Sequence, residues 1–199
     1  EVKDVLEDTY ANTQLRGDGQ VVVVGFNRMS VEVVPAFATH HEQYLICDTH
    51  AGGRYKSSDP KAELEFLNNA NNEYNRNARP LIRILKTWQE HCNMSSLKSF
   101  VIEILCIEYL TRIQWSKNGW FYYDWLVRDF FGFLYRCANF VVYVPGTGEQ
   151  LPLGDRWKAS AETAYKRACK ACYFEYNDDV VSAGLEWQKI FGKKIPVIP

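Results

Sequence analysis

Residues 21–37 run Val-Val-Val-Val-Gly-Phe-Asn-Arg-Met-Ser-Val-Glu-Val-Val-Pro-Ala-Phe. The β-branched run at 21–26 predicts a buried strand, because stiff branched side chains pack well on a pleated surface. Asn27-Arg28 is suited to the tip of a hairpin, and 31–37 predicts a second strand that ends at Pro35 or just beyond it. This stretch therefore predicts a hairpin within a small sheet.

The segments on either side extend this sheet. Residues 2–10 have apolar side chains at helical spacing, which predicts a helix before the first strand. Gly17-Asp18-Gly19 predicts a turn, and Tyr44-Leu45-Ile46-Cys47 predicts a third strand. The N-terminal quarter is therefore expected to be a piece of sheet with a helix against it.

The pattern changes at Asp59-Pro60, where a residue suited to a helix cap precedes a proline. From there the spacing of apolar residues predicts a succession of helices, with one extended run at 141–144. The expected helices cover about 60–75, 79–91, 97–114, 120–139, 157–177 and 179–191. We expect an α+β fold, with a sheet domain at 1–58 and a helical domain at 59–199.

The composition excludes several classes of protein. Among the 199 residues, 47% are hydrophobic and 15% aromatic, enough for a packed core rather than a disordered chain. The net charge of -1 argues against a protein that coats nucleic acid. No apolar run reaches the ~20 residues that span a membrane. The six cysteines include no second pair to complete a zinc site around Cys169 and Cys172. We expect reduced thiols and a cytoplasmic protein.

Glu32 is an acid within an otherwise apolar strand. A divalent cation is one partner that makes such a carboxylate favourable, because hard cations prefer oxygen ligands. The alternative is a glutamate on the solvated face of an edge strand, and the pattern alone leaves both open.

A second candidate is the segment from Gly52 to Ser58. Its glycines allow a ligand to approach the backbone, and Arg54, Lys56 and Ser58 are donors for phosphate or base. The alternative is an ordinary polar loop that leads into a capped helix.

A third and a fourth candidate lie on successive predicted helices. Arg79, Arg83 and Lys86 share one helix face by their spacing. Ser99 lies in the first turn of the next helix, where free N–H groups favour anions, and Phe100 beside it offers a ring for stacking. The alternatives are a solvated basic stripe and a phenylalanine that belongs to the core.

The order of these motifs is more specific than any one of them. Glu32 is followed by Val-Pro-Ala-Phe, then by Gly-Gly-Arg-Tyr-Lys and Ser-Asp-Pro at 52–60. Next come Asn-x-x-x-Asn-x-x-x-Arg-Pro-Leu-Ile-Arg-x-Leu-Lys-x-Trp at 71–88 and Leu-Lys-Ser-Phe-x-x-Glu at 97–103. This order resembles the cyclic GMP-AMP synthase-like and dinucleotide cyclase-like nucleotidyltransferases of bacterial anti-phage systems. The resemblance covers nearly the whole chain and includes Glu186-Trp187-Gln188-Lys189-Ile190-Phe191-Gly192 near its end.

The resemblance implies a role for each matching residue. Glu32 falls on the family's third metal-binding acid, which is often Asp. Lys86 falls on the triphosphate-binding lysine and Ser99 on the phosphate-binding serine, while Phe100 stands where a base-stacking tyrosine is usual. Residues 52–58, with Arg54, Lys56 and Ser58, match the lining of the base pocket. Implied with them are Mg²⁺ or Mn²⁺ as cofactor and nucleoside triphosphates such as ATP and GTP as substrates.

The sequence departs from the family in one respect. Neither the family's Gly-Ser turn nor its Asp-x-Asp strand has a counterpart in these residues. We therefore expect residues 1–58 to be a remnant of the nucleotidyltransferase palm, and the printed chain to be inactive alone. An upstream segment or a separate piece is expected to supply the other two acids, and a regulatory partner remains open.

Two other functions stay open at this stage. One is a synthase of linear oligonucleotides, and the other is a nucleotide-binding module without catalysis. His91-Cys92 is not followed by the cysteines of the zinc insertion that marks the animal DNA-sensing branch, so DNA is not expected as a ligand.

Overall fold

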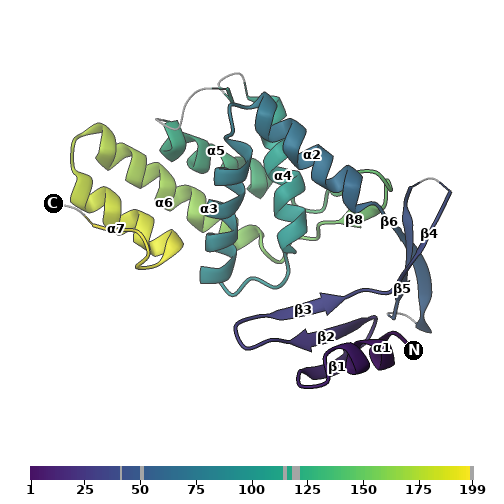
Figure 1. Cartoon of the computed structure of the whole chain (residues 1–199). Helices are drawn as coiled ribbons and strands as arrows, with labels where there is room; N and C mark the ends of the chain where they lie inside the picture. Colours follow the sequence, from purple (N-terminus) through teal and green to yellow (C-terminus); the bar gives the residue numbers. More distant parts are fainter. Residues whose placement is uncertain (41, 50–51, 114–115, 118–121, 198–199) are drawn as a thin grey trace. The chain divides into compact units, whose positions relative to one another are not determined.

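The computed structural model describes residues 1–40, 42–49, 52–113, 116–117 and 122–197 (Figure 1). Helices and small antiparallel sheets alternate along it, which confirms the predicted α+β class. The chain divides into two compact units, which are described one at a time. The first unit comprises 1–62 with 145–147, and the second comprises 63–144 with 148 onward.

The first unit contains a sheet in the order β1-β2-β3, preceded by helix α1 at Val2–Thr9. Its antiparallel strands are β1 at Gln14–Asp18, β2 at Val21–Gly25 and β3 at Ser30–Val33. Val22 and Val24 are buried, whereas Val21 and Val23 are only half-buried. The valine run therefore forms a strand as predicted, but only one face of that strand is buried, because successive side chains point to opposite sides.

A second sheet follows in the order β4-β5-β6, with β4 at Ala36–Ala38, β5 at Tyr44–Asp48 and β6 at Arg54–Ser58. The single strand expected at 31–37 is therefore wrong, since β3 and β4 belong to different sheets and Val34-Pro35 lies between them. Proline has no N–H to donate to a ladder, so the chain leaves the first sheet there.

Two further expectations need correction. Gly17 and Asp18 lie in β1, and the turn falls one residue later, at Gly19 with a φ of 58°. Residues 54–58 form a strand rather than the expected polar loop, with Arg54 to Ser58 paired to β5 along its length. The ladder to β5 compensates for the low strand propensity of this polar segment.

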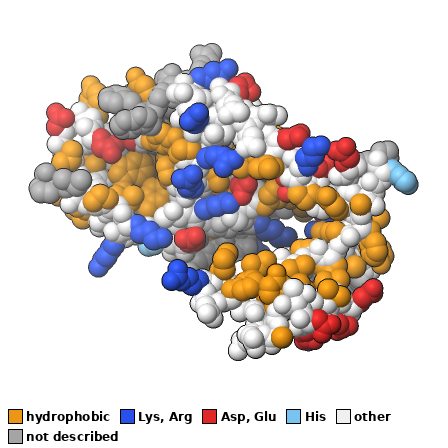
Figure 2. Space-filling view, viewed as in Figure 1, with side chains coloured by type: hydrophobic (Ala, Val, Ile, Leu, Met, Phe, Trp, Pro, Cys, Tyr) orange, Lys and Arg blue, Asp and Glu red, His pale blue; other side chains and the backbone are white. Residues whose placement is uncertain are grey.

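Many large apolar side chains of the first unit are exposed. Figure 2 shows them gathered over its strands, and they include Met29, Phe37 and Tyr55. The segment 145–147 belongs to this unit because Gly146 lies against the start of α2. A side chain on Gly146 would meet the Ala62 Cβ at 2.6 Å, and its φ of 80° also favours glycine.

The second unit contains the remaining helices and one short hairpin. Asp59 accepts the N–H of Ala62 at 2.9 Å and so caps α2 as predicted. The helices are α2 at Pro60–Glu73, which begins in the first unit, α3 at Ala78–His91, α4 at Ser99–Arg112, α5 at Tyr123–Arg136, α6 at Lys158–Tyr176 and α7 at Val180–Phe191. The hairpin joins β7 at Val141–Tyr143 to β8 at Gln150–Pro152.

The core of the second unit is formed by one face of each helix. Helix α4 contributes most, with a nearly continuous set of buried residues from Val101 to Leu110. Helix α6 contributes alanines instead, and these small side chains let α5 and α7 pack closely on it. None of the helices in the described part of the chain has the length and apolar character that a membrane span requires.

Candidate functional site

Glu32 lies in β3, with Val23 of β2 directly across the ladder. Its side chain is exposed, and it forms no ion pair with the described residues. Because β3 presents its apolar side chains to the other face, the carboxylate is accessible without a cost of burial. One exposed carboxylate suits Mg²⁺ or Mn²⁺ as a hard ligand, but it is only one donor of the several that such a cation takes.

The donors predicted at 54–58 share one face of a strand. Arg54, Lys56 and Ser58 alternate along β6, so their side chains point to the same side. Arg54 donates from Nε to the Oδ2 atom of Asp48 at 2.9 Å, and Asp48 is buried. Arg54 is therefore held in place by an acid within the sheet, while Lys56 and Ser58 are half-buried beside it in register.

In the second unit, Lys86 of α3 is paired with Glu103 of α4. The Lys86 Nζ atom donates to the Glu103 Oε1 atom at 2.5 Å, and both side chains are about a third or less exposed. Glu103 lies four residues after Ser99, so both face the same side of α4. The ion pair thereby brings the Lys86 ammonium to the helix face that carries Ser99.

Helix α4 begins at Ser99, and no side chain caps it. The N–H groups of its first turn are therefore free to bind an anion, and the helix dipole adds to that preference. Gln89 of α3 donates to the carbonyl oxygen of Leu97 and fixes the segment that enters the helix. Ser99 is exposed, whereas Phe100 is half-buried and packs against the core.

The basic stripe on α3 is only partly available. Arg79 donates from Nη2 to the Oδ1 atom of Asn68 at 2.6 Å, and its backbone N–H donates to Asn71 at 3.2 Å. Asn71 thus stabilises the start of α3, which gives this residue of the predicted motif a structural role. Leu81, Leu85 and Trp88 line the buried face of α3 as expected.

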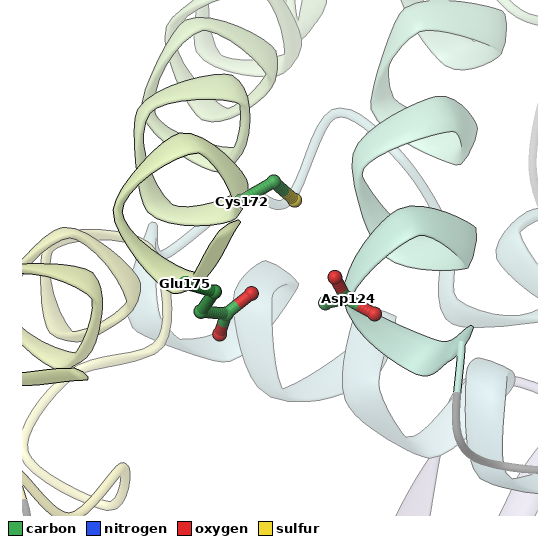
Figure 3. A group of neighbouring side chains, drawn as sticks. All are labelled: Asp124, Cys172 and Glu175. Carbon is green, nitrogen blue, oxygen red and sulfur yellow. The ribbon is translucent and has the colours of Figure 1, made fainter. Parts of the chain in front are cut away.

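The structure also brings together three residues that the sequence did not indicate. Asp124 at the start of α5 faces Cys172 and Glu175 near the end of α6, and their ligand atoms all lie within 4.8 Å of one another (Figure 3). Glu175 accepts the indole N–H of Trp187 on its Oε1 atom at 2.8 Å, while its Oε2 atom is buried without a hydrogen bond. We call Asp124 and Glu175 the carboxyl pair.

The surroundings of this group alter its acidity. Burial raises the pKa of the Glu175 carboxyl, and the nearby charge of Asp124 raises it further. Burial also raises the pKa of the Cys172 thiol, to about 12. In the described residues neither member of the carboxyl pair has an ion-pair partner, so their negative charges are compensated only in part.

Glu175→Gln is expected to stabilise the protein at pH 8. A carboxyl whose pKa is raised by folding contributes stability below its unfolded pKa, and loses that contribution as pH rises through its folded pKa. A neutral amide avoids the loss and still accepts from Trp187. Thermal melts from pH 4 to pH 8 should show a gain in Tm at high pH that shrinks toward pH 4. A variant that is less stable than the wild type at every pH would contradict this.

The comparisons with known proteins agree with the motif order. Residues 1–71 match the family model of the Second Messenger Oligonucleotide or Dinucleotide Synthetase domain. The chain is 24% identical over 196 residues to a cyclic AMP-AMP-AMP synthase of Acinetobacter sp. (strain ATCC 27244 / 9458), covering 92% of this chain and 56% of that protein. It is 25% identical over 176 residues to a "Probable cyclic nucleotide synthase" of Bacillus cereus (strain VD146), covering 83% and 51%. The chain thus spans about half the length of these curated relatives.

Solved structures show the same fold. The CdnC:HORMA-deltaN complex of E. coli MS115-1 matches with a TM-score of 0.76 at 15% identity, over 98% of this chain and 70% of that chain. The cyclic AMP-GMP synthase DncV of Vibrio cholerae matches with a TM-score of 0.78 at 12% identity, over 99% and 58%. Its complex with nonhydrolyzable GTP matches with a TM-score of 0.76 at 13% identity, over 96% and 55%.

Together these findings support the cyclic GMP-AMP synthase/DncV-like nucleotidyltransferase family, and the resemblance stated from the motifs is confirmed. The two curated relatives are described as a cyclic AMP-AMP-AMP synthase and a probable cyclic nucleotide synthase, and the solved structures show the shared fold. The roles of Glu32, Lys86, Ser99, Phe100, Arg54, Lys56 and Ser58 remain predictions, because no comparison addresses single residues.

Proposed function

We propose that the protein to which this chain belongs is a nucleotidyltransferase that makes cyclic oligonucleotide second messengers from nucleoside triphosphates, in the cytoplasm, in defence against phage. The observation that carries the proposal is the match of residues 1–71 to the Second Messenger Oligonucleotide or Dinucleotide Synthetase domain. The resemblance assigns ATP, GTP or both as substrates and Mg²⁺ or Mn²⁺ as cofactor. In this proposal, residues 1–58 are the palm portion and 59–199 the helical domain.

The donor triphosphate is assigned to the face of α4 that carries Ser99. Three kinds of donor meet an anion there: the free N–H groups of the first turn, the Ser99 hydroxyl and the Lys86 ammonium. To bind the phosphate, Lys86 has to break its ion pair with Glu103. A partly exposed ion pair contributes about 0–1 kcal/mol, so this exchange costs little. The ring of Phe100 stacks on the base.

Catalysis then rests on positioning and charge. A divalent cation, when bound, neutralises phosphate charge and favours ionisation of the attacking ribose hydroxyl. Glu32 is the residue of this chain that would hold it, because its carboxylate is exposed and has no ion-pair partner among the described residues. Arg54 and Lys56 of β6 bind and orient the base or the phosphates of a nucleotide. Little covalent work is left for the protein, so orientation provides most of the rate.

The test is product analysis with the full-length gene product. It is incubated with Mg²⁺ and each combination of ribonucleoside triphosphates, and the products are treated with phosphatase. Cyclic products resist phosphatase and have the mass of a closed ring, whereas linear oligonucleotides lose a terminal triphosphate. Linear products alone would favour the linear synthase, and nucleotide binding without turnover would favour the inactive module.

A protein partner is a further part of the proposal. The E. coli CdnC structure is a complex with HORMA-deltaN, so a protein regulator is one explanation should the purified protein prove inactive. Repeating the incubation with the products of the neighbouring genes tests this.

Lys86→Ala in the full-length protein is expected to raise the KM for the donor nucleotide by roughly 10- to 150-fold, since hydrogen bonds to charged groups contribute about 1.5–3 kcal/mol. The Tm should change little, because the pair with Glu103 is partly exposed. Lys166→Ala is the matched control, because Lys166 is paired with Glu162 at 2.7 Å on α6. Steady-state kinetics check both variants. An unchanged KM for Lys86→Ala would show that Lys86 belongs to a solvated basic stripe and does not bind the nucleotide.

A further inference from the structure

Two hollows in the second unit meet at the carboxyl pair. One has a volume of about 640 Å³ and is lined mainly by aromatic side chains, with Tyr122, Trp125 and Tyr176 among them. The other has a volume of about 310 Å³ and is lined mainly by apolar side chains from α3, α5 and α7, among them Ile84, Val127 and Phe191. Both include Tyr123, Asp124 and Glu175, so the carboxyl pair forms the wall that they share. Volumes of this size are typical of sites for small molecules.

The charge at this wall is negative and incompletely compensated. Glu175 lies at the C-terminal end of α6, where the free carbonyl groups add further negative potential. Its buried Oε2 atom has no hydrogen-bond donor, and no ion pair joins a cation to either carboxyl among the described residues. Arg128, whose charge acts on Cys172, is itself bound to Asp129 at 2.7 Å. The site is therefore complementary to a positive charge.

The aromatic walls select the kind of cation. Rings attract cations over their faces, and the attraction grows when water is excluded. The Trp125 ring already has such a contact, with the Arg128 guanidinium 5.7 Å from its centroid. Tyr122 packs against Trp125 with ring centroids 5.7 Å apart, so two of the rings that line this hollow are held together. A hydrated metal ion would gain little from these rings, whereas an organic cation contacts them directly.

The thiol argues in the same direction. Cys172 lies beside the carboxyl pair, and its side chain is buried. A neutral thiol is a small apolar surface, which suits the methyl or methylene groups of an organic cation.

We propose that these adjoining hollows bind a small alkylammonium ligand, with its cationic head between the carboxyl pair and the aromatic rings and its alkyl body in the 310 Å³ cavity. None of the lining residues is among those assigned to the nucleotide. The ligand contacts α5, α6 and α7 together and is expected to stabilise their packing. Figure 2 shows hydrophobic side chains gathered in the region of α6 and α7, where the alkyl body would lie.

The test uses probes of equal shape and different charge. Choline and its neutral isostere 3,3-dimethylbutan-1-ol are titrated at pH 8 into the full-length gene product labelled with ¹⁵N-tryptophan. The readout is the indole N–H signal of Trp187, which donates to Glu175, assigned with Trp187→Phe. Choline is expected to shift this signal to saturation, and the isostere is expected to bind at least ~10-fold more weakly. Equal responses to the two probes would overturn the proposal.

A second arm tests the alkyl body. Butyltrimethylammonium has three more methylenes than tetramethylammonium, and each that is fully buried tightens binding by up to about fourfold. Equal affinity for the two would show that the 310 Å³ cavity takes no part, and would overturn that part of the proposal. Zn²⁺ is titrated separately, and saturation by Zn²⁺ together with no response to choline would replace the proposed ligand with a metal ion.

Matched variants locate the site. Glu175→Gln and Asp124→Asn keep the shapes of the two side chains, and each is expected to weaken choline binding by at least ~10-fold, on the scale of losing one charge from a partly buried pair. Glu162→Gln makes the same change elsewhere on α6, where Glu162 pairs with Lys166, and should bind as the wild type does. Wild-type affinity in both Glu175→Gln and Asp124→Asn would place choline elsewhere and overturn the assignment.

Discussion

Glu32→Gln in the full-length gene product is expected to slow nucleotide incorporation by at least ~10²-fold, on the scale of removing one group that stabilises charge in a transition state. Gln keeps the size of the side chain and loses its charge, so it removes the ability to hold a divalent cation while β3 stays intact. Glu32 is exposed and lies opposite Val23 in the ladder, so neither packing nor strand pairing depends on its carboxylate. Incorporation of labelled nucleotide under saturating Mg²⁺ gives the measurement.

Two controls make this result specific. Glu7→Gln changes another exposed glutamate of the first unit, and its rate should stay within about twofold of the wild type, as is usual for a surface change away from the chemistry. Glu32→Asp restores the acid that the family often has and should recover most of the activity. Near-wild-type turnover by Glu32→Gln would leave Glu32 as a glutamate on a solvated strand, and would remove the metal assignment from this residue.

The fold was predictable where local patterns decide it. The hairpin at Asn27-Arg28 follows from two β-branched runs with a polar tip, and the cap at Asp59 follows from its place before Pro60. The helices follow from the spacing of residues such as Leu81, Leu85 and Trp88, all of which are buried. In these cases the spacing of hydrophobic residues and the capping residues favour the same local structure, and the tertiary contacts favour it too.

The parts that failed depend on pairing between distant residues. Strand β6 has a polar sequence, and it is a strand because Arg54 to Ser58 pair with β5, with Arg54 bound to the buried Asp48. The separation of β3 from β4 depends on which sheet each joins after Pro35. A single sequence shows where a proline interrupts strand pairing. It does not show which strand each segment will pair with.

The candidate site shows the same division. Ser99 was predictable as a first-turn residue, because a strongly apolar helix follows it. The pair between Lys86 and Glu103 was not, since the two residues lie on different helices whose packing sets their distance. The carboxyl pair was missed for the same reason: Asp124 and Glu175 are 51 positions apart in the printed sequence. Each looks like an ordinary acid at a helix end until α5 and α6 pack together.

Phe130→Ala is expected to lower the stability of the second unit by about 3–5 kcal/mol, the usual range for removing a buried aromatic side chain. Phe130 is fully buried, and its ring contacts Tyr109 edge to face with centroids 5.5 Å apart. The ring also lies 6.0 Å from that of Phe133, centroid to centroid. Truncation leaves a cavity between α4 and α5 that these rings cannot fill without leaving their rotamers. In thermal unfolding this corresponds to a fall in Tm of roughly 6–20 °C.

Phe140→Ala is the matched control, because Phe140 is 58% exposed and its removal opens no cavity. Its Tm should stay within about 2 °C of the wild type, since surface changes usually cost under 0.5 kcal/mol. Equal losses in the two variants would show that the interior of the second unit is not packed around Phe130. Phe130 is not among the residues assigned to the nucleotide, and it lines neither of the two hollows. The folded fraction of Phe130→Ala should therefore keep the wild-type KM for nucleotide at 20 °C. Glu32→Gln should show the reverse, an unchanged Tm with a lost rate, so the two variants separate what holds the fold together from what performs the chemistry.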